Sequence, residues 1–144
     1  MIVDASVLLH AFLPDEVQPN ALALVREHVS GRLQLKAPAL LPYELSNAVW
    51  QAERRGRINL DQVERVIKSF ANLEIDLIPQ GWGEMLPLAR QFGLNAYDAA
   101  YLALAQQLGE AFITGDLRLY HAVHPRLEWV LWIGDYPTEL KEIP

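Results

Sequence analysis

Cysteine is absent from this sequence, which excludes disulfide bonds and metal sites built on thiolates. A long apolar run is absent as well. A membrane-spanning helix needs about 18 such residues, and the longest candidates here are interrupted by His10 and Gln106. The first residues, Met1 to Asp4, lack the basic patch and apolar stretch of a signal peptide. We therefore expect a cytoplasmic protein that does not enter a membrane.

An excess of positive charge is also missing. The net charge is −6, which argues against a nucleic-acid partner because phosphates repel acidic surfaces. The charge is unevenly distributed, however, since Arg54, Arg55 and Arg57 are clustered whereas several acids stand alone after apolar runs. An acidic protein with a basic rim can bind RNA if divalent cations neutralise its acidic pocket. Net charge alone leaves the question open.

The 144 residues are 51% hydrophobic and 21% charged, which is typical of one globular domain over residues 1–144. Short apolar runs alternate with longer amphipathic ones, a pattern that predicts an α/β fold with a parallel sheet. The expected strands are Met1–Val3, Leu33–Ala37, Glu74–Ile78, Ala111–Thr114 and Glu128–Ile133. The expected helices are Asp4–Leu13, Pro19–Val29, Pro42–Arg55, Asp61–Ala71, Gly83–Phe92 and Ala96–Leu108, with a short one after Asp116.

Local signals support several of these helices. Pro42 and Gly56 stand at the start and just past the end of one helix, as proline and glycine favour. Asp61 and Glu64 are spaced like an N-cap residue and the acid three positions after it. The alanine-rich helix Ala96–Leu108 is thin enough to lie close against a sheet, so we expect it to be buried.

Four acidic residues fall where a parallel α/β sheet binds its ligands. Asp4 ends the first strand, and Asp116 follows another strand after one glycine. Glu44 and Asp98 each lie in the first turn of a helix. The carboxyl ends of parallel strands and the following helix N-termini share one edge. The sequence therefore predicts that four carboxylates from distant segments converge there.

Each acid also has a simpler interpretation. A carboxylate at a helix N-terminus accepts hydrogen bonds from free backbone N–H groups and is stabilised by the helix dipole. Asp4 and Asp116 would then cap the helices that follow them, and Asp98 would form a capping pair with Asn95. The joint arrangement favours a site, because crowded acids raise one another's pKa unless cations lie among them. Clusters of oxygen ligands suit Mg²⁺ or Mn²⁺.

With these acids in these positions, the sequence resembles a known family, the PIN-domain nucleases, and within it the VapC-type toxins of toxin–antitoxin pairs. Order and spacing match over nearly the whole chain. The motifs are Asp4-Ala5-Ser6, Glu44-Leu45-Ser46-Asn47, Tyr97-Asp98-Ala99 and Thr114-Gly115-Asp116. The resemblance implies a parallel sheet of order 3-2-1-4-5 with helices on both faces. It also implies Mg²⁺- or Mn²⁺-dependent cleavage of RNA, a homodimer, and an antitoxin that blocks the acidic pocket.

The resemblance assigns roles to individual residues. The family's acidic, metal-binding positions fall on Asp4, Glu44, Asp98 and Asp116. Its supporting hydroxyl positions fall on Ser6 and Thr114. Asn47 lies one helical turn beyond Glu44, so it can reach the same pocket. No further acid follows closely after Asp116, where some relatives carry one.

The expected mechanism follows from metal chemistry. A bound cation lowers the pKa of a water for in-line attack on phosphorus and stabilises the charge that builds on the phosphate oxygens. The sequence offers no alternative nucleophile, since there is no cysteine and the histidines are dispersed. Arg54, Arg55 and Arg57 either contact the RNA backbone or form a solvated helix end.

Two other functions are compatible with an acid after the first strand. A phosphoacceptor domain also places an acid after its first strand, but it needs a lysine near the phosphate. The only lysines are Lys36, Lys68 and Lys141, and none follows a strand at the right edge. A catalytically silent PIN-like scaffold that binds RNA or protein is the second alternative. All four acids are intact, which favours the nuclease.

Overall fold

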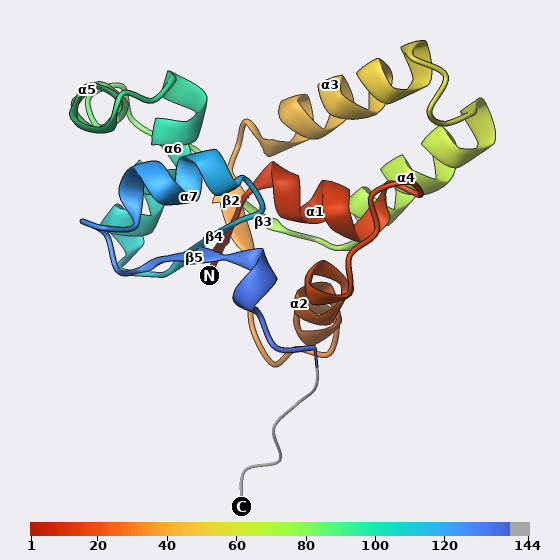
Figure 1. The fold of residues 1–144 in the computed structure, drawn as a ribbon, viewed down its shortest axis with the longest axis horizontal. Coiled ribbons are helices and arrows are strands. Elements are labelled where there is room, and N and C mark those ends of the chain that lie inside the picture. Colours follow the sequence, from red (N-terminus) through yellow and green to blue (C-terminus); the bar gives the residue numbers. More distant parts are fainter. Residues whose placement is uncertain (139–144) are drawn as a thin grey trace, which may run out of the picture.

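The fold is built on a five-stranded parallel sheet. A computed structural model of the chain describes residues 1–138, and Lys141 lies outside them. The strand order is β3-β2-β1-β4-β5 (Figure 1), and every neighbouring pair is parallel. The order predicted from the resemblance is therefore confirmed. The strands are β1 (Ile2–Val3), β2 (Lys36–Pro38), β3 (Asp76–Ile78), β4 (Phe112–Thr114) and β5 (Val130–Trp132).

Helices cover both sides of the sheet, as predicted. In Figure 1, α1 and α2 lie on one side of the strands, and α6 and α7 lie on the other. The helices are α1 (Ala5–Phe12), α2 (Pro19–Val29), α3 (Leu41–Arg54), α4 (Leu60–Asn72), α5 (Met85–Phe92), α6 (Ala96–Leu108) and α7 (Leu117–Val123), followed by the 3₁₀ helix η1 (Ile133–Asp135). Within residues 1–138, no helix is long and apolar enough to cross a membrane.

The helix α6 is the buried helix that the sequence predicts. Every residue from Ala99 to Ala105 is buried, because α6 packs against strands β1, β2 and β4 while α5 covers its other side. Its N-cap is Asn95, whose side chain accepts a hydrogen bond from the backbone N–H of Asp98 at 2.8 Å. This cap fixes the start of α6, and with it the position of Asp98.

The helices α3 and α4 form a hairpin that extends away from the sheet (Figure 1). A second, smaller apolar cluster fills the space between this hairpin and α1. Just past the end of α3, Arg57 donates two hydrogen bonds to Asp15 and one to Glu16, in the loop between α1 and α2. The turn of the hairpin is thus tied to the loop after α1 by an ion-pair network, and its helices are held to α1 by burial.

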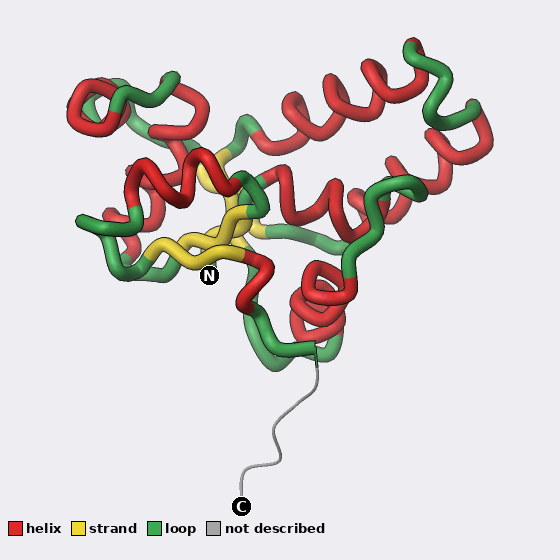
Figure 2. Tube along the Cα trace, viewed as in Figure 1, coloured by secondary structure: helices red, strands yellow, loops and turns green. Residues whose placement is uncertain are grey.

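The observed strands are shorter than those predicted, as Figure 2 makes clear. The N–H of Leu35 bonds to Nδ1 of His28 rather than to a neighbouring strand, so β2 begins at Lys36. Glu74 has a φ of 52°, a turn conformation that delays β3 to Asp76. Ile133 already begins η1, which ends β5 at Trp132.

Two predicted helix starts were wrong. The helix expected from Gly83 begins at Met85, because Gly81 and Gly83 favour an irregular turn over a helical one. The cap of α4 is Asn59, not Asp61. Asn59 accepts from the N–H of Gln62, whose side chain accepts from the N–H of Asn59, in a capping box.

Replacement of the true cap tests this correction. We expect Asn59→Ala to lower the free energy of unfolding by about 1 kcal/mol, because the backbone N–H of Gln62 in the first turn of α4 loses its partner. Asp61→Ala is the matched control, and it should cost only about 0.3 kcal/mol through the helix dipole. Urea unfolding of the three proteins measures both values. Equal losses for the two variants would contradict the assignment of Asn59 as the cap.

Candidate active site

The carboxylate of Asp4 lies at the centre of the sheet edge. Asp4 follows β1 and occupies the N-cap position of α1, but its side chain makes no capping hydrogen bond. Instead, its Oδ2 accepts from Ser6 Oγ at 2.8 Å and from Thr114 Oγ1 at 2.7 Å. The residue is only 6% exposed. The hydroxyls of two segments thus hold one buried carboxylate, and capping is not its role.

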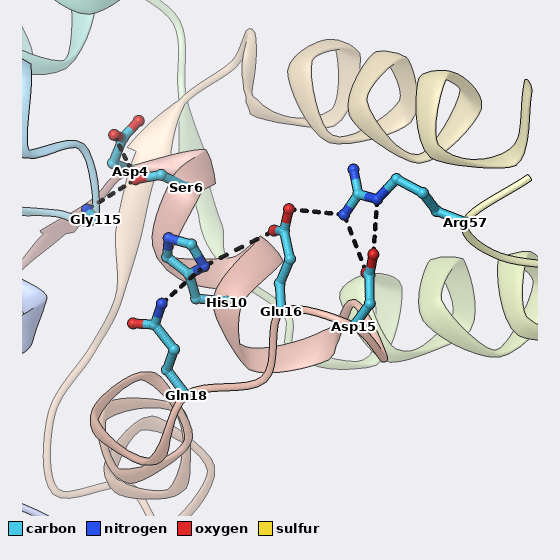
Figure 3. A network of polar contacts seen from close by, with 8 residues as sticks. All are labelled: Asp4, Ser6, His10, Asp15, Glu16, Gln18, Arg57 and Gly115. Atoms are coloured by element: carbon cyan, nitrogen blue, oxygen red, sulfur yellow. Dashed lines mark hydrogen bonds and ion pairs between the residues drawn. The ribbon is translucent and has the colours of Figure 1, made fainter. Parts of the chain in front are cut away.

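The turn after β4 brings its backbone against the same group of side chains. The N–H of Gly115 donates to Ser6 Oγ at 2.8 Å (Figure 3), and the N–H of Asp116 donates to Thr114 Oγ1 at 3.0 Å. A Cβ at Gly115 would lie 2.7 Å from Cδ2 of His10 and 3.2 Å from Ser6 Oγ. A side chain larger than that of glycine would therefore have to displace the ring of His10 or move the turn, a constraint that the spacing of the motif does not reveal.

Asp116 combines two of the roles that the sequence left open. It is the N-cap of α7, and its Oδ1 accepts from the N–H groups of Arg118 and Leu119 at 2.9 and 3.2 Å. Its side chain also lines the pocket that contains Asp4. One oxygen caps the helix, and the capping bonds do not use the other.

Glu44 and Asp98 approach the same pocket from two helices. Glu44 lies in the first turn of α3, and Asp98 lies in the first turn of α6. Both are half-buried. Asn47, one turn further along α3, also lines the pocket. The structure thus brings together all four predicted acids, which surround one pocket with Ser6 and Asn47, while Thr114 supports it from below through Asp4.

The environment of the pocket disfavours ionised carboxylates. Burial raises the pKa of Asp4, although the hydrogen bonds from Thr114 and Ser6 oppose this effect. Burial also raises the pKa of Glu44 to about 7, with a further contribution from the charges of Asp4 and Asp98. The pKa of Asp98 is raised to about 6 by burial and by repulsion from Asp4 and Asp116. Each of the three acids would be stabilised by a cation.

The donor set fits a hard divalent cation. All of the candidate ligands are oxygens, which Mg²⁺ and Mn²⁺ prefer. The Oε1 atom of Glu44 is buried and has no hydrogen-bond partner among the described residues. In the same part of the chain, no three acidic or histidine side chains stand close enough together to surround an ion by themselves. This arrangement suits an ion that keeps several waters and takes few protein ligands.

The three predicted RNA-binding arginines lie in different surroundings. The guanidinium of Arg57 is engaged by Asp15 and Glu16 (Figure 3), so a phosphate would have to displace those carboxylates. Arg54 lies over the ring of Trp50, 5.7 Å from its centroid. Arg55 ends α3 and is exposed. Arg54 and Arg55 are therefore better placed than Arg57 to contact RNA.

The lysines do not support a phosphoacceptor site. Lys36 pairs with Glu110 at 2.7 Å, at the amino end of β2. Lys68 is exposed on α4. Neither lysine is among the residues that line the acidic pocket.

One residue beside the acids was missed from the sequence. Tyr101 follows Asp98 by three positions in α6, so it lies on the same side of the helix. It is completely buried, and the acids Asp4 and Glu44 contribute to raising the pKa of its hydroxyl. The helical spacing was the available signal, but an aromatic residue in a buried helix is more often part of the core.

Known proteins are similar to this chain in sequence and in fold. The PIN domain family model matches residues 1–124. Ribonuclease VapC3 from Pyrobaculum aerophilum is 29% identical over 123 residues, which cover 83% of this chain and 91% of that protein. VapC ribonuclease Mb0985 from Mycobacterium bovis is 32% identical over 120 residues, which cover 83% of this chain and 87% of the relative.

A solved structure gives the same result. The crystal structure of PAE2754 from Pyrobaculum aerophilum matches this fold with a TM-score of 0.70 and 26% sequence identity. The match covers 92% of this chain and 83% of the other. The chain therefore belongs to the PIN domain family, and its relatives there include VapC ribonucleases.

Proposed function

We propose that this protein is a Mg²⁺- or Mn²⁺-dependent ribonuclease that cleaves RNA phosphodiester bonds. The observation that carries the proposal is the convergence of Asp4, Glu44, Asp98 and Asp116 on one pocket. None of the four forms a salt bridge within residues 1–138. Uncompensated acids at the ligand-binding edge of a parallel sheet are costly for a scaffold and useful for a metal enzyme.

The four acids would hold the ion, in part through the waters that it keeps. A bound Mg²⁺ or Mn²⁺ supplies a water of lowered pKa and a positive charge beside the scissile phosphate. Ser6 and Thr114 keep one oxygen of Asp4 fixed through their hydrogen bonds. Asp116 is oriented by the N-terminus of α7. Asn47 provides a neutral side chain at the rim, and Arg54 and Arg55 would attract the RNA backbone by charge.

The relatives also suggest partners. Similarity to VapC ribonucleases supports a role as the toxin of a toxin–antitoxin pair. We propose in addition that the protein acts as a homodimer in the cytoplasm. We propose that a cognate antitoxin inserts an arginine or lysine among the four acids. A guanidinium there would form bidentate hydrogen bonds with carboxylates that otherwise repel one another.

Charge removal at Asp98 tests the proposed role of the acids. Asp98→Asn keeps the size of the side chain, and the cap of α6 is supplied by Asn95, so folding should be unaffected. Without the charge, the ion loses a ligand, and RNA cleavage should fall by more than about 100-fold. Cleavage of cellular RNA with Mn²⁺, with melting curves recorded in parallel, measures both effects.

The control for this test is Asp61→Asn, which removes the same charge from the exposed face of α4. It should cleave RNA like the parent protein. If EDTA abolishes the activity of the parent but Asp98→Asn still cleaves normally, Asp98 is not part of the site. If the parent itself cleaves no RNA with either cation, the catalytically silent scaffold is the better description.

The raised pKa values predict how stability depends on pH. The pKa of Glu44 rises from 4.5 in the unfolded chain to about 7 on folding, so the folded protein binds a proton that the unfolded chain releases. Between these values, the metal-free protein should become less stable as the pH increases. Glu44→Gln removes this titration, so its melting temperature should fall less over the same range.

Added Mn²⁺ should reverse the trend, because protons and the ion compete for the same carboxylates. We expect a larger increase in melting temperature at about pH 7.5 than at about pH 5.5. Differential scanning fluorimetry at both pH values, with EDTA or with millimolar Mn²⁺, gives the four melting temperatures. Identical pH profiles for the parent and Glu44→Gln would show that Glu44 does not have a raised pKa.

The close approach at Gly115 gives a separate test. In Gly115→Ala, the new Cβ meets the ring of His10 and the hydroxyl of Ser6, so the turn, the ring or the hydroxyl must shift, and we expect the turn to move away from Asp4. We expect cleavage to fall about 10- to 100-fold with little loss of folding. The double variant His10→Ala/Gly115→Ala removes most of the collision and should recover part of the activity. Failure of that recovery would mean that the ring of His10 does not set the position of the turn.

A further inference from the structure

Tyr101 is a buried polar residue that the proposed mechanism does not use. Its side chain is 0% exposed, and its hydroxyl has no hydrogen-bond partner among the described residues. Buried tyrosine hydroxyls usually find a partner, so an unpaired one requires an explanation. If only packing mattered at this position, phenylalanine would fill the same space without a buried polar atom.

A second buried oxygen without a partner belongs to Glu44, which interacts with Tyr101. Only two buried side-chain oxygens or nitrogens of the described residues lack a partner, namely Tyr101 OH and Glu44 Oε1. The two groups are close enough that each affects the pKa of the other. The phenol is in contact with the carboxylate and lowers the pKa of Glu44, although the contact falls outside the geometry of an ordinary hydrogen bond. Two unpaired groups, one a donor and one an acceptor, therefore lie side by side beneath the pocket.

The phenol is the fixed member of this pair. The residues around Tyr101 in α6 are all buried, and its ring packs against Phe112 of β4, with the centroids 5.7 Å apart. Glu44, in contrast, is half-buried at the mouth of the pocket and has three side-chain torsions. The glutamate can therefore rotate to improve its contact with the hydroxyl, whereas the tyrosine cannot move without disturbing the core.

We propose that Tyr101 is a positioning residue for Glu44, whose carboxylate accepts a hydrogen bond from the phenol when an ion occupies the pocket. One oxygen of Glu44 is then held by Tyr101, and the other is left for the ion. Tyr101 does not touch RNA or the reacting atoms. This inference rests on the proposed function, since it assigns a support to one of the proposed ligands. Groups that orient ligands in this way typically affect metal affinity by about 10- to 100-fold.

The test is Tyr101→Phe, which keeps the ring and removes only the hydroxyl. We expect Mn²⁺ affinity, measured by titration calorimetry, to fall by about 10- to 100-fold while the melting temperature of the metal-free protein stays the same or increases. A merely structural tyrosine would give the same melting result with unchanged affinity. Unchanged affinity would therefore overturn the proposal.

Tyr136→Phe is a matched control. The hydroxyl of Tyr136 also donates to a glutamate, Glu27 of α2, away from the acidic pocket. Its removal should leave Mn²⁺ affinity unchanged. An equal loss of affinity in both variants would show a general effect of losing a tyrosine hydroxyl, which would also overturn the proposal.

A double-mutant cycle shows whether the hydroxyl acts through Glu44. In a Glu44→Ala background, Tyr101→Phe should cause no further loss of Mn²⁺ affinity, because the group that it orients is gone. A loss of the same size in both backgrounds would show that the hydroxyl acts on another ligand, such as Asp4. If Glu44→Ala binds too weakly to titrate, the increase in melting temperature caused by millimolar Mn²⁺ replaces the titration, and Tyr101→Phe should reduce this increase in the parent background but not in the Glu44→Ala background.

The cycle also separates this inference from the proposed function. If the parent protein binds no Mn²⁺ and cleaves no RNA, the proposed function fails, and the role of Tyr101 fails with it. If the parent binds Mn²⁺ and cleaves RNA but Tyr101→Phe does both equally well, only the role of Tyr101 fails.

Discussion

The buried carboxylate of Asp4 is the constraint on which the rest of the site depends. A charged group with so little exposure is costly unless hydrogen bonds or cations compensate it. Ser6 and Thr114 provide two hydrogen bonds, but burial still raises the pKa of Asp4. The compensation is therefore incomplete. The same hydroxyls bind the turn after β4 through the N–H groups of Gly115 and Asp116. A group that a cation would stabilise is thus also the group that joins two neighbouring strands, which couples the stability of the sheet edge to occupation of the pocket.

The topology explains why the four acids meet although they are far apart in the sequence. The strands β1 and β4 are neighbours at the centre of the sheet, so the residues that follow them, Asp4 and Asp116, leave the same edge side by side. The connections from β1 and from β4 run to opposite sides of the sheet, which opens a crevice at this point. The helices α3 and α6 then direct Glu44 and Asp98 into it. The buried helix α6 matters most, because its packing against three strands leaves its first turn little freedom to shift.

Much of this arrangement was predictable from the sequence, for identifiable reasons. Period and turn signals located the strands and helices, and parallel strands share a carboxyl edge, so convergence of the acids followed from their positions alone. The contacts that refine the site were not predictable. Asn59 rather than Asp61 caps α4. Both residue types are good N-caps, so the sequence alone does not distinguish between them. Arg57 is held by Asp15 and Glu16, acids more than forty positions away that no local pattern connects to it. The proximity of Tyr101 to Glu44 depends on how α3 and α6 are placed in the folded structure, which no local sequence pattern predicts.

Capping and metal binding, which are alternatives when the sequence is considered alone, are compatible in the structure. Asp116 uses one oxygen to cap α7, and this contact fixes the orientation of the other. Asp98 is relieved of capping by Asn95, so its carboxylate need not serve the helix at all. Asp4 has lost the capping contact entirely and is held by hydroxyls instead. The three acids thus differ in whether they cap the helix that they precede or begin: Asp116 does, and Asp4 and Asp98 do not. Burial and repulsion between acids raise the pKa of Asp4 and of Asp98, and that penalty is what a divalent cation would remove on binding.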